Sequence, residues 1–251
     1  LSDDYSRQEL NLEAVRSHLA QRSALPGESL DVGSRFVAYA AYFGLESDRY
    51  YSKDHKIGPY PALFFSNSKR VLDIQAKNGW EPVFVDFEVS DNPMLSCAQG
   101  KILKQLPHLF PQLNQFAYSL YFDDKLPPPD ASILVSVDEL ERSGLPFALA
   151  EHPYPGGNIL FELQRAQEQR RYLLQNEQMI RFISRELEQG GSLTRATLYQ
   201  GGTILRNMTM AETTSFGEEW YRKTLECGIQ DQIPLNFVTE GFEFATLKKW
   251  Y

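Results

Sequence analysis

The stretch AYSLYFDDK, residues 117–125, decides the fold that this sequence predicts. Aromatic and apolar side chains recur at alternate positions as far as Phe122, which is the period of a β-strand. Three prolines follow in residues 126–130 (LPPPD), and proline cannot continue a central strand. Asp123 and Asp124 are therefore expected to lie at the carboxyl end of a buried strand.

The two adjacent acids at this strand end have two interpretations. In an open α/β sheet, ligands bind at the carboxyl ends of the strands, because the loops there form a crevice. Asp123 and Asp124 would then suit a hard divalent cation, which takes oxygen ligands and bridges phosphates. In the other interpretation they form a solvated turn, since Asp opens turns and Lys and Pro follow it readily. The local pattern alone favours the turn.

The composition indicates a globular protein and excludes several classes of partner. The chain has 251 residues and 28.8 kDa, with 42% hydrophobic and 13% aromatic residues, which is enough for one large α/β domain with appendages. Its net charge is −8 and it has no basic block, so nucleic acid is not expected as a partner. Cys97 and Cys227 show no metal-ligand spacing. No apolar run approaches the ~20 residues that cross a bilayer, so no membrane span is expected in this chain.

The N-terminal region predicts a helix joined to the domain by a linker. Residues 6–19 have roughly helical apolar spacing and begin with a capping box at Ser6, and residues 25–33 are rich in Pro and Gly. We therefore expect an N-terminal helix and linker over residues 1–33 and one domain over residues 34–251. Because the chain begins with Leu rather than Met, we also expect it to be part of a larger, multidomain protein.

The order of the remaining elements favours a mainly parallel sheet. Residues 35–44, 61–66 and 81–87 predict strands, and the long connections between them favour crossovers rather than hairpins. A glycine pair, Gly201-Gly202, either bends a later strand or lets a group approach its backbone closely. The other predicted strands are 132–137, 146–150, 197–207 and a final strand or tail at 242–251, and the predicted helices are 67–77, 98–106, 161–189, 215–228 and 232–239.

Short sequence blocks between residues 35 and 238 follow one another in a recognisable order, although no GxGxxG, Walker, GxSxG or HExxH motif is present. A strand closed by Gly44 and one closed by Ser66 precede Gly79-Trp80. A basic helix, KILKQLPH at residues 101–108, then precedes the aromatic strand that ends at Asp123. The later blocks are His152-Pro153, Glu162, Ile204-Leu-Arg206, Trp220 and Gln230-Asp231-Gln232.

In this order the blocks resemble a glycosyltransferase family known mainly from plant Golgi proteins of mucilage and cell-wall synthesis, one of which was once described as an alkaline ceramidase. The resemblance implies a GT-A-like α/β fold, with a mainly parallel central sheet flanked by helices. It also implies a nucleotide-sugar donor, a polysaccharide or glycan acceptor and a divalent cation, Mn²⁺ or Mg²⁺. We expect a cytoplasmic protein if the source is bacterial and a Golgi-lumen protein if it is plant-like, and prefer the former.

Three positions depart from the family pattern. The family arginine is Lys101 here, which keeps the positive charge but loses the bidentate fork. Gln230 stands where the family has arginine before Asp-Gln, which removes a cation. Lys125 stands where an Asp-x-Asp motif has its second acid, so Asp124 is expected to serve as the second metal ligand beside Asp123.

The donor side is expected to be built from strand ends and the basic helix. Transfer from a nucleotide sugar requires compensation of the charge that develops on the leaving diphosphate, by a metal or by fixed cations. Lys101 and Lys104 lie one turn apart and are expected to contact this diphosphate, although an ordinary solvated helix face has the same pattern. Tyr42 and Ser66, at the ends of the first two strands, are expected to contact the base and ribose.

The catalytic and acceptor residues follow from the later blocks. An inverting enzyme needs a base for the acceptor hydroxyl, and Asp231 is the first candidate, although the same residue could cap a helix. His152, at a strand end beside Pro153, is either a site residue or a turn residue. The acceptor-binding candidates are Glu162, Arg206, Trp220 and Gln232; for Trp220 the alternative is a place in the core, and for Arg206 an ion pair with an acid.

The sequence therefore predicts a GT-A-like glycosyltransferase that moves a sugar from a nucleotide-sugar donor to a carbohydrate acceptor, with metal assistance. One alternative is a non-catalytic carbohydrate-binding or assembly module on the same fold, which Lys125 and Gln230 make conceivable. The other is a metal-dependent hydrolase that uses Asp123, Asp124 and His152.

Overall fold

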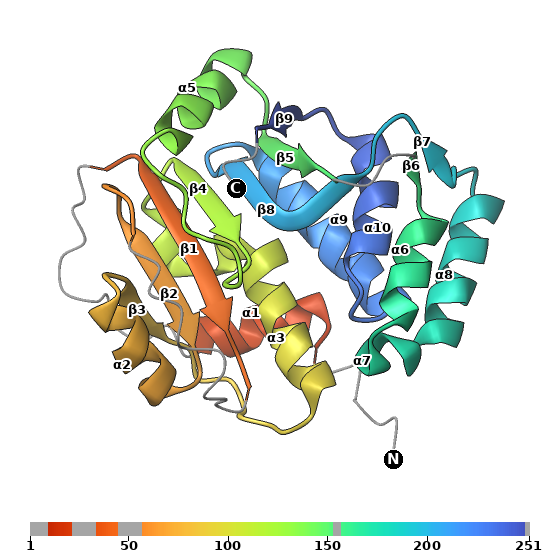
Figure 1. The fold of residues 1–251 in the computed structure, drawn as a ribbon, viewed down its shortest axis with the longest axis horizontal. Coiled ribbons are helices and arrows are strands. Elements are labelled where there is room, and N and C mark those ends of the chain that lie inside the picture. Colours follow the sequence, from red (N-terminus) through yellow and green to blue (C-terminus); the bar gives the residue numbers. More distant parts are fainter. Residues whose placement is uncertain (1–9, 22–33, 45–56, 153–156, 249–251) are drawn as a thin grey trace.

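A computed structural model describes residues 10–21, 34–44, 57–152 and 157–248 of the chain. Its core is a mixed α/β arrangement around one seven-stranded sheet, in the order β3-β2-β1-β4-β8-β5-β9 (Figure 1). The strands are β1 (Phe36–Tyr42), β2 (Ala62–Ser66), β3 (Glu81–Phe84), β4 (Tyr118–Phe122), β5 (Phe147–Glu151), β8 (Tyr199–Asn207) and β9 (Ala245–Leu247). Two further short strands, β6 (Gly157–Asn158) and β7 (Thr194–Arg195), pair with each other.

The sheet is mostly parallel, as predicted. Strands β1 to β4 run parallel, and β9 runs parallel to β5, whereas β8 is antiparallel to both of its neighbours. From β1 the chain steps outward to β2 and β3 and then returns to β4 on the other side of β1. This reversal makes the carboxyl ends of β1 and β4 the switch point of the sheet, where open α/β sheets form their ligand crevice.

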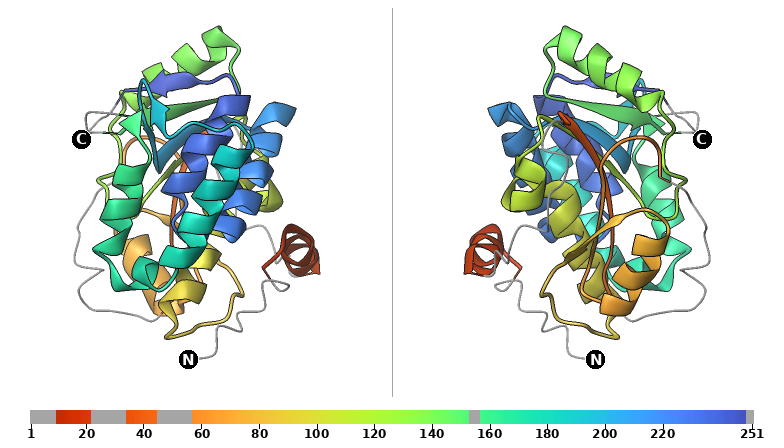
Figure 2. Two further views of the ribbon diagram at one scale, coloured as in Figure 1. Left: turned by 90° about the vertical axis from the view of Figure 1, so that its right-hand side faces the viewer. Right: turned by 90° about the vertical axis from the view of Figure 1, so that its left-hand side faces the viewer.

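Helices cover both faces of the sheet. The helices are α1 (Leu12–Gln21), α2 (Lys69–Lys77), α3 (Pro93–Gln105), α4 (Pro111–Asn114), α5 (Ile133–Ser143), α6 (Leu160–Gln167), α7 (Arg170–Leu173), α8 (Asn176–Glu188), α9 (Ala211–Cys227) and α10 (Gln232–Val238), with 3-10 turns at Pro107–Leu109 and Thr239–Gly241. One apolar cluster packs α2 and α5 on one face. Another packs α3 and part of α9 on the opposite face, and Figure 2 shows α1 on this second side.

The predicted N-terminal helix packs against the domain. In α1 the Val15 side chain is buried in the same apolar cluster as α3, and the Tyr221 hydroxyl of α9 donates a 2.7 Å hydrogen bond to the Leu10 carbonyl. The helix ends two residues later than predicted, and its predicted capping box at Ser6 and the whole of the linker predicted over residues 25–33 lie outside the described residues. The division at residue 33 stays a prediction.

Two element predictions in the middle of the chain were wrong. Residues 132–137 were predicted as a strand but begin α5, because Ile133, Val137 and Leu140 are buried at helical spacing. The single helix predicted over 161–189 is divided into α6, α7 and α8. Its predicted apolar stripe is also wrong except at Ile183: Leu173, Ile180 and Leu187 are exposed, and the buried positions of α8 are Met179, Phe182, Ile183 and Glu186.

Of the two helices near the C-terminus, α9 begins earlier than predicted, whereas α10 begins at the predicted Gln232 but without a side-chain cap. The capping box expected at Ser215 does not start α9, which begins at Ala211; instead the Ser215 hydroxyl bonds back to the Ala211 carbonyl one turn earlier. Asp231 stands at the N-cap position of α10 but its side chain makes no cap hydrogen bond. Among the described residues, every helix is too short or too polar to cross a lipid bilayer.

Candidate functional site

A buried cluster of opposite charges lies where α3 meets the start of α10. The Lys101 ammonium is 2.6 Å from Asp231 Oδ1, and the Lys104 ammonium is 2.7 Å from Asp231 Oδ2. The side chains of Lys101, Lys104 and Asp231 are 16%, 5% and 6% exposed, so all three charges are largely removed from water. The lysines do share one face of α3, as predicted, but it faces this acid and not the solvent.

Trp220 contacts both Asp231 and Lys104. Its indole Nε1 donates a 2.9 Å hydrogen bond to the Asp231 carbonyl, which holds the backbone at the start of α10. The Lys104 ammonium lies over the Trp220 ring at 5.4 Å and over the Tyr121 ring at 5.5 Å, within cation–π range. Because Trp220 is fully buried, stacking on an acceptor sugar is not available to it, and the alternative of a core tryptophan is the correct one.

The cluster keeps Asp231 ionised. Burial raises the pKa of Asp231, but Lys101 and Lys104 outweigh burial and hold that pKa well below its usual range. Burial lowers the pKa of Lys101, but the charge and hydrogen bond of Asp231, together with Tyr172 and Asp123, outweigh burial, and the net shift is upward. For Lys104 burial prevails and its pKa is lowered. A carboxylate held in this way is a weak base for as long as both lysines contact it.

Asp123 continues the cluster at the end of β4. The Tyr121 hydroxyl donates to Asp123 Oδ1 at 3.0 Å, and the Lys125 ammonium lies 3.3 Å from Oδ2. Burial raises the pKa of Asp123, but Lys104, Lys125 and Lys101 together outweigh it, so the net shift is downward. Burial and the neighbouring Asp123 raise the pKa of Tyr121 well above its ordinary value, which keeps its hydroxyl as a donor.

The Gly201-Gly202 pair permits this close packing. A Cβ atom on Gly201 would lie 3.0 Å from the Trp220 ring and 3.2 Å from the Lys104 ammonium, and one on Gly202 would lie 3.3 Å from Asp123 Oδ2. Of the two interpretations of the pair, close approach is therefore confirmed. The pairing of β5 with β8 also shifts register here, so the strand bends as well.

Gln232 and Arg206 are occupied by contacts within the chain. Gln232 Oε1 accepts a 2.8 Å hydrogen bond from the Gly201 amide and its Nε2 donates to the Tyr199 carbonyl, which fixes the bend in β8. Arg206 is fully buried and donates to the Tyr39 hydroxyl at 3.1 Å and to the Lys104 carbonyl at 2.6 Å. Arg206 therefore anchors α3, and a direct contact with an acceptor is not available to it.

The two predicted strand-end contacts have different surroundings. Tyr42 is half-buried at the end of β1, beside the switch point. Ser66 is fully buried, and its hydroxyl accepts a 3.1 Å hydrogen bond from the Ser68 amide in the turn that leads into α2. A contact between the Ser66 side chain and a ribose is not open in this arrangement.

His152 and Glu162 form a second polar pair. His152 follows β5 and Glu162 lies in the first turn of α6, and the His152 Nε2 atom is 2.8 Å from Glu162 Oε1. The backbone amide of His152 donates to the Leu198 carbonyl at 2.7 Å, which fixes the strand end. The sequence marked both residues but for separate roles, and the structure brings the two side chains into contact.

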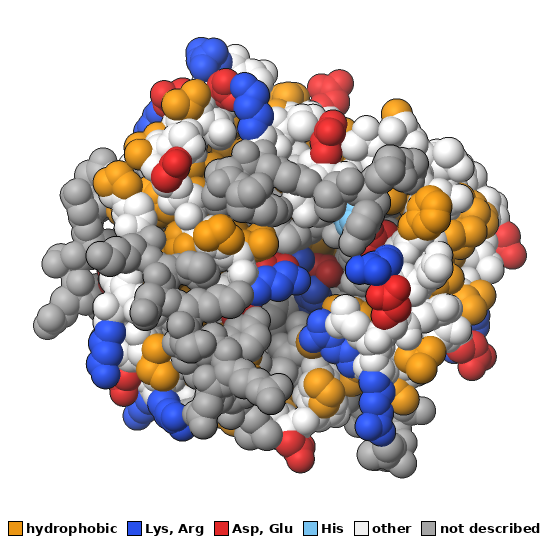
Figure 3. All heavy atoms as spheres, in the orientation of Figure 1, with side chains coloured by type: hydrophobic (Ala, Val, Ile, Leu, Met, Phe, Trp, Pro, Cys, Tyr) orange, Lys and Arg blue, Asp and Glu red, His pale blue; other side chains and the backbone are white. Residues whose placement is uncertain are grey.

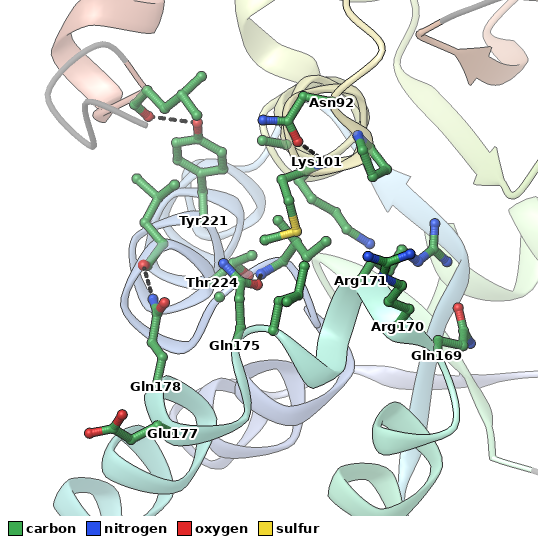
Figure 4. Close-up of a pocket in the computed structure, with 18 of the residues that line it drawn as sticks. Asn92, Lys101, Gln169, Arg170, Arg171, Gln175, Glu177, Gln178, Tyr221 and Thr224 are labelled. Carbon is green, nitrogen blue, oxygen red and sulfur yellow. Dashed lines mark hydrogen bonds between the residues drawn. The ribbon is translucent and has the colours of Figure 1, made fainter. Parts of the chain in front are cut away.

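A cleft of about 1110 Å³ opens beside the lysine cluster, and Lys101 forms part of its wall. The cleft lies between the first half of α3, the segment around α7, the start of α8 and the end of α9 (Figure 4). Figure 3 shows a hollow at the middle of one face, with Lys, Arg and acidic side chains gathered around it. Sequence reasoning missed Arg170 and Arg171 of this cleft, although adjacent arginines in a chain of net charge −8 were a usable signal.

The residues at the end of β4 fit a divalent cation only together with a ligand. Asp123 and Asp124 offer oxygen atoms at one turn, which is the ligand type that Mn²⁺ and Mg²⁺ take. Within the described ranges there is no group of three His, Cys, Asp or Glu side chains that could hold a metal. A cation bound by this pair would need the remaining ligands from a diphosphate and from water.

No protein-family model matches this sequence, and no curated protein matches it. Among solved structures, the apo form of mouse xyloside xylosyltransferase 1 is similar, with a TM-score of 0.52, 9% identity and coverage of 85% of each chain. The bifunctional glycosyltransferase WbbM matches with a TM-score of 0.45, 13% identity and coverage of 89% of this chain and 40% of that one. The mannosyltransferase Ktr4p of S. cerevisiae matches with a TM-score of 0.47, 6% identity and coverage of 98% and 80%. The likeness to the xylosyltransferase confirms the predicted GT-A-like fold, and the resemblance to the plant mucilage family stays a prediction.

Proposed function

We propose that this chain is a glycosyltransferase that moves a sugar from a nucleotide-sugar donor to a carbohydrate acceptor. One observation carries the proposal: on a GT-A-like sheet, Asp123 directly follows β4 at the switch point and lies within electrostatic reach of the buried Lys101 and Lys104. Perturbed charges at such a position are typical of functional sites. The donor would lie across the carboxyl ends of β1 and β4, near Tyr42 and Asp123.

The lysines supply the charge that sugar transfer requires. When the bond from the sugar to the diphosphate breaks, negative charge grows on the leaving oxygen, and fixed cations stabilise it. Lys101 is the more exposed of the two lysines that hold Asp231 and also faces the cleft, so it is the one we assign to the diphosphate. Lys104, buried over Trp220, holds the cluster in place.

We also propose a divalent cation at Asp123 and Asp124, held together with the diphosphate. When bound, such a cation supplies further compensation of the phosphate charge. The Lys125 ammonium beside Asp123 Oδ2 would have to move away, and its side chain is 65% exposed and able to do so.

Two groups are candidates for the base that accepts the proton of the acceptor hydroxyl. Asp231 is ionised, but its basicity rises only when Lys101 transfers its contact from the carboxylate to the diphosphate of the donor. Donor binding would then prepare the base, which couples the two halves of the reaction. His152 is the second candidate, because its contact with the Glu162 carboxylate fixes the orientation of the imidazole ring.

A nucleotide screen tests the proposed function. Thermal unfolding would be followed with UDP-, GDP-, CMP- and dTDP-sugars, each with and without Mn²⁺. A rise in the midpoint with one nucleotide class supports the transferase, because a ligand that binds only the folded state stabilises it. A rise that needs Mn²⁺ and is lost in Asp123→Asn supports the proposed cation as well.

The same screen separates the alternative functions. Binding of an oligosaccharide without a response to any nucleotide would indicate the non-catalytic module. Phosphoester hydrolysis that disappears in Asp123→Ala would indicate the hydrolase, which is less well supported since Asp123, Asp124 and His152 form no three-ligand group in the described part of the chain. Normal turnover in Asp231→Asn, with the fold intact, would remove Asp231 as the base.

A further inference from the structure

The cleft beside Lys101 is a basic site in an acidic protein. Its wall carries Lys101, Arg170, Arg171 and Arg181, against the two acids Asp91 and Glu177, whereas the whole chain has a net charge of −8. In Figure 4 the Lys101 side chain extends from α3 towards the segment that carries Arg170 and Arg171. The cleft therefore concentrates positive charge next to the proposed reaction centre.

Two of these four cations are already neutralised. The Arg181 guanidinium pairs with Glu177 one turn earlier in α8, at 2.5 Å, and Lys101 pairs with Asp231. Arg170 and Arg171 have no carboxylate partner among the residues that the structure describes. The cleft thus presents two adjacent guanidinium groups whose charge no carboxylate of the described residues balances.

Arg171 is held in place for an anion. Its Nη1 atom donates to Cys97 Sγ at 3.2 Å, and its guanidinium lies over the Tyr172 ring at 4.7 Å. Its Nε atom is enclosed and has no hydrogen-bond acceptor in the described residues. A half-buried guanidinium without a counter-charge is costly, and its planar, fixed donors match a carboxylate or phosphate group.

The rest of the wall suits a sugar chain. Next to the two arginines, Gln169 presents an exposed amide, and Leu174 is a 68% exposed apolar side chain. Amides bond hydroxyl groups, and apolar side chains contact the hydrophobic faces of sugar rings. The volume of about 1110 Å³ exceeds what a single small ion needs and lies at the upper end for small-molecule sites.

We infer that this cleft binds an acidic glycan, an acceptor with carboxylate or phosphate groups, and that Arg170 and Arg171 recognise those groups. The role of this glycan as the acceptor rests on the proposed function. The donor is assigned to the ends of β1 and β4, whereas the cleft lies against α7, α8 and α9, so the two ligands meet at Lys101. Specificity for acidic acceptors is therefore set by a segment that takes no part in donor binding.

Binding of defined oligosaccharides to the full chain tests this inference by calorimetry. The probes are an oligouronide of four to six units, its carboxyl-reduced neutral counterpart, and a phosphorylated oligosaccharide of similar length. The double variant Arg170→Gln/Arg171→Gln should weaken binding of the preferred acidic probe about tenfold or more, as expected when charge-assisted hydrogen bonds are lost. Arg165→Gln, which removes an arginine on α6 that pairs with Glu168 outside the cleft, should leave binding unchanged.

The outcomes are distinguishable. Preference for the oligouronide assigns the site to carboxylates, and preference for the phosphorylated probe assigns it to phosphates. Equal binding of the acidic and neutral probes, no binding of any probe, or unchanged binding in the double variant would overturn the inference. So would a double variant that loses the thermal response to a nucleotide sugar, because the cleft would then be the donor site. Binding of an acidic probe by a protein that responds to no nucleotide sugar would support the inference about the cleft and refute the proposed glycosyltransferase function.

Discussion

Replacing Asp231 by Asn would leave two buried ammonium groups without their shared counter-charge. Lys101 and Lys104 contact different oxygens of this one carboxylate, and all three side chains are at most 16% exposed. Removal of one partner from a buried ion pair costs about 3–5 kcal/mol, because the remaining charge is uncompensated. In a protein of this size that loss corresponds to a fall in the unfolding midpoint of about 6–20 °C.

The assay is urea and thermal unfolding of Asp231→Asn beside a matched surface control. Asp138→Asn makes the same chemical change at an acid that pairs with Arg35, where the Asp138 side chain is 54% exposed. Surface ion pairs contribute about 0–1 kcal/mol, so the control should unfold almost as the parent does. A loss in Asp231→Asn no larger than that of Asp138→Asn would refute the reasoning about the buried cluster.

The pH dependence of the same variant gives a second check. Burial already lowers the pKa of Lys104, and without Asp231 nothing nearby opposes burial as strongly. A lysine whose folded pKa lies below its unfolded value binds fewer protons when folded, so stability should rise with pH. The difference between parent and variant should therefore shrink between pH 7 and 10. Lys104→Met should restore part of the stability in the Asp231→Asn background but destabilise the parent.

Further predictions concern the neighbours of this cluster. Gly201→Ala should lower the free energy of unfolding by about 1–3 kcal/mol in denaturant titrations, because the added methyl group would crowd the Trp220 ring and the Lys104 ammonium. Trp220→Phe should cost about 1 kcal/mol, from the lost indole bond to the Asp231 carbonyl, and the variant should still fold. Asp123, with its lowered pKa, contributes stability that is present above the unfolded carboxyl pKa of about 3.9 and is lost as pH falls through the folded value. Stability of Asp123→Asn should accordingly depend less on pH between 5 and 3 than that of the parent, and an equal dependence would contradict this.

The sheet could be predicted from sequence because its strands are locally distinctive. Residues 117–125 combine β-period alternation with a proline stop, and the observed β4 ends at Phe122, directly before Asp123. Residues 132–137 were wrongly predicted as a strand because the run ILVSV is apolar and rich in β-branched residues, as strands are. Leu140 lies beyond this run and is buried together with Ile133 and Val137, and this spacing of buried residues is that of a helix.

The candidate site was harder to predict because its contacts join distant parts of the chain. Asp231 precedes a helix, and a local interpretation makes it a cap; its actual partners Lys101 and Lys104 lie about 130 residues earlier. The sequence shows that Arg206 is charged but does not indicate that its side chain is buried under α3. The pattern placed Asp123 directly after a strand, as observed, but only the packing of α3, α9 and α10 shows which charges meet.

The buried charges are better explained by function than by stability. A cluster of two lysines and one aspartate inside the domain costs desolvation energy, and apolar side chains of similar size could often replace such a group at no loss. Sites where a chain departs from the rules of core packing are expected to be functional. Here the departure lies between the switch point of the sheet and a cleft that holds the adjacent Arg170 and Arg171. In the reaction we propose, Lys101 would therefore contact the donor diphosphate on one side and the acidic acceptor on the other.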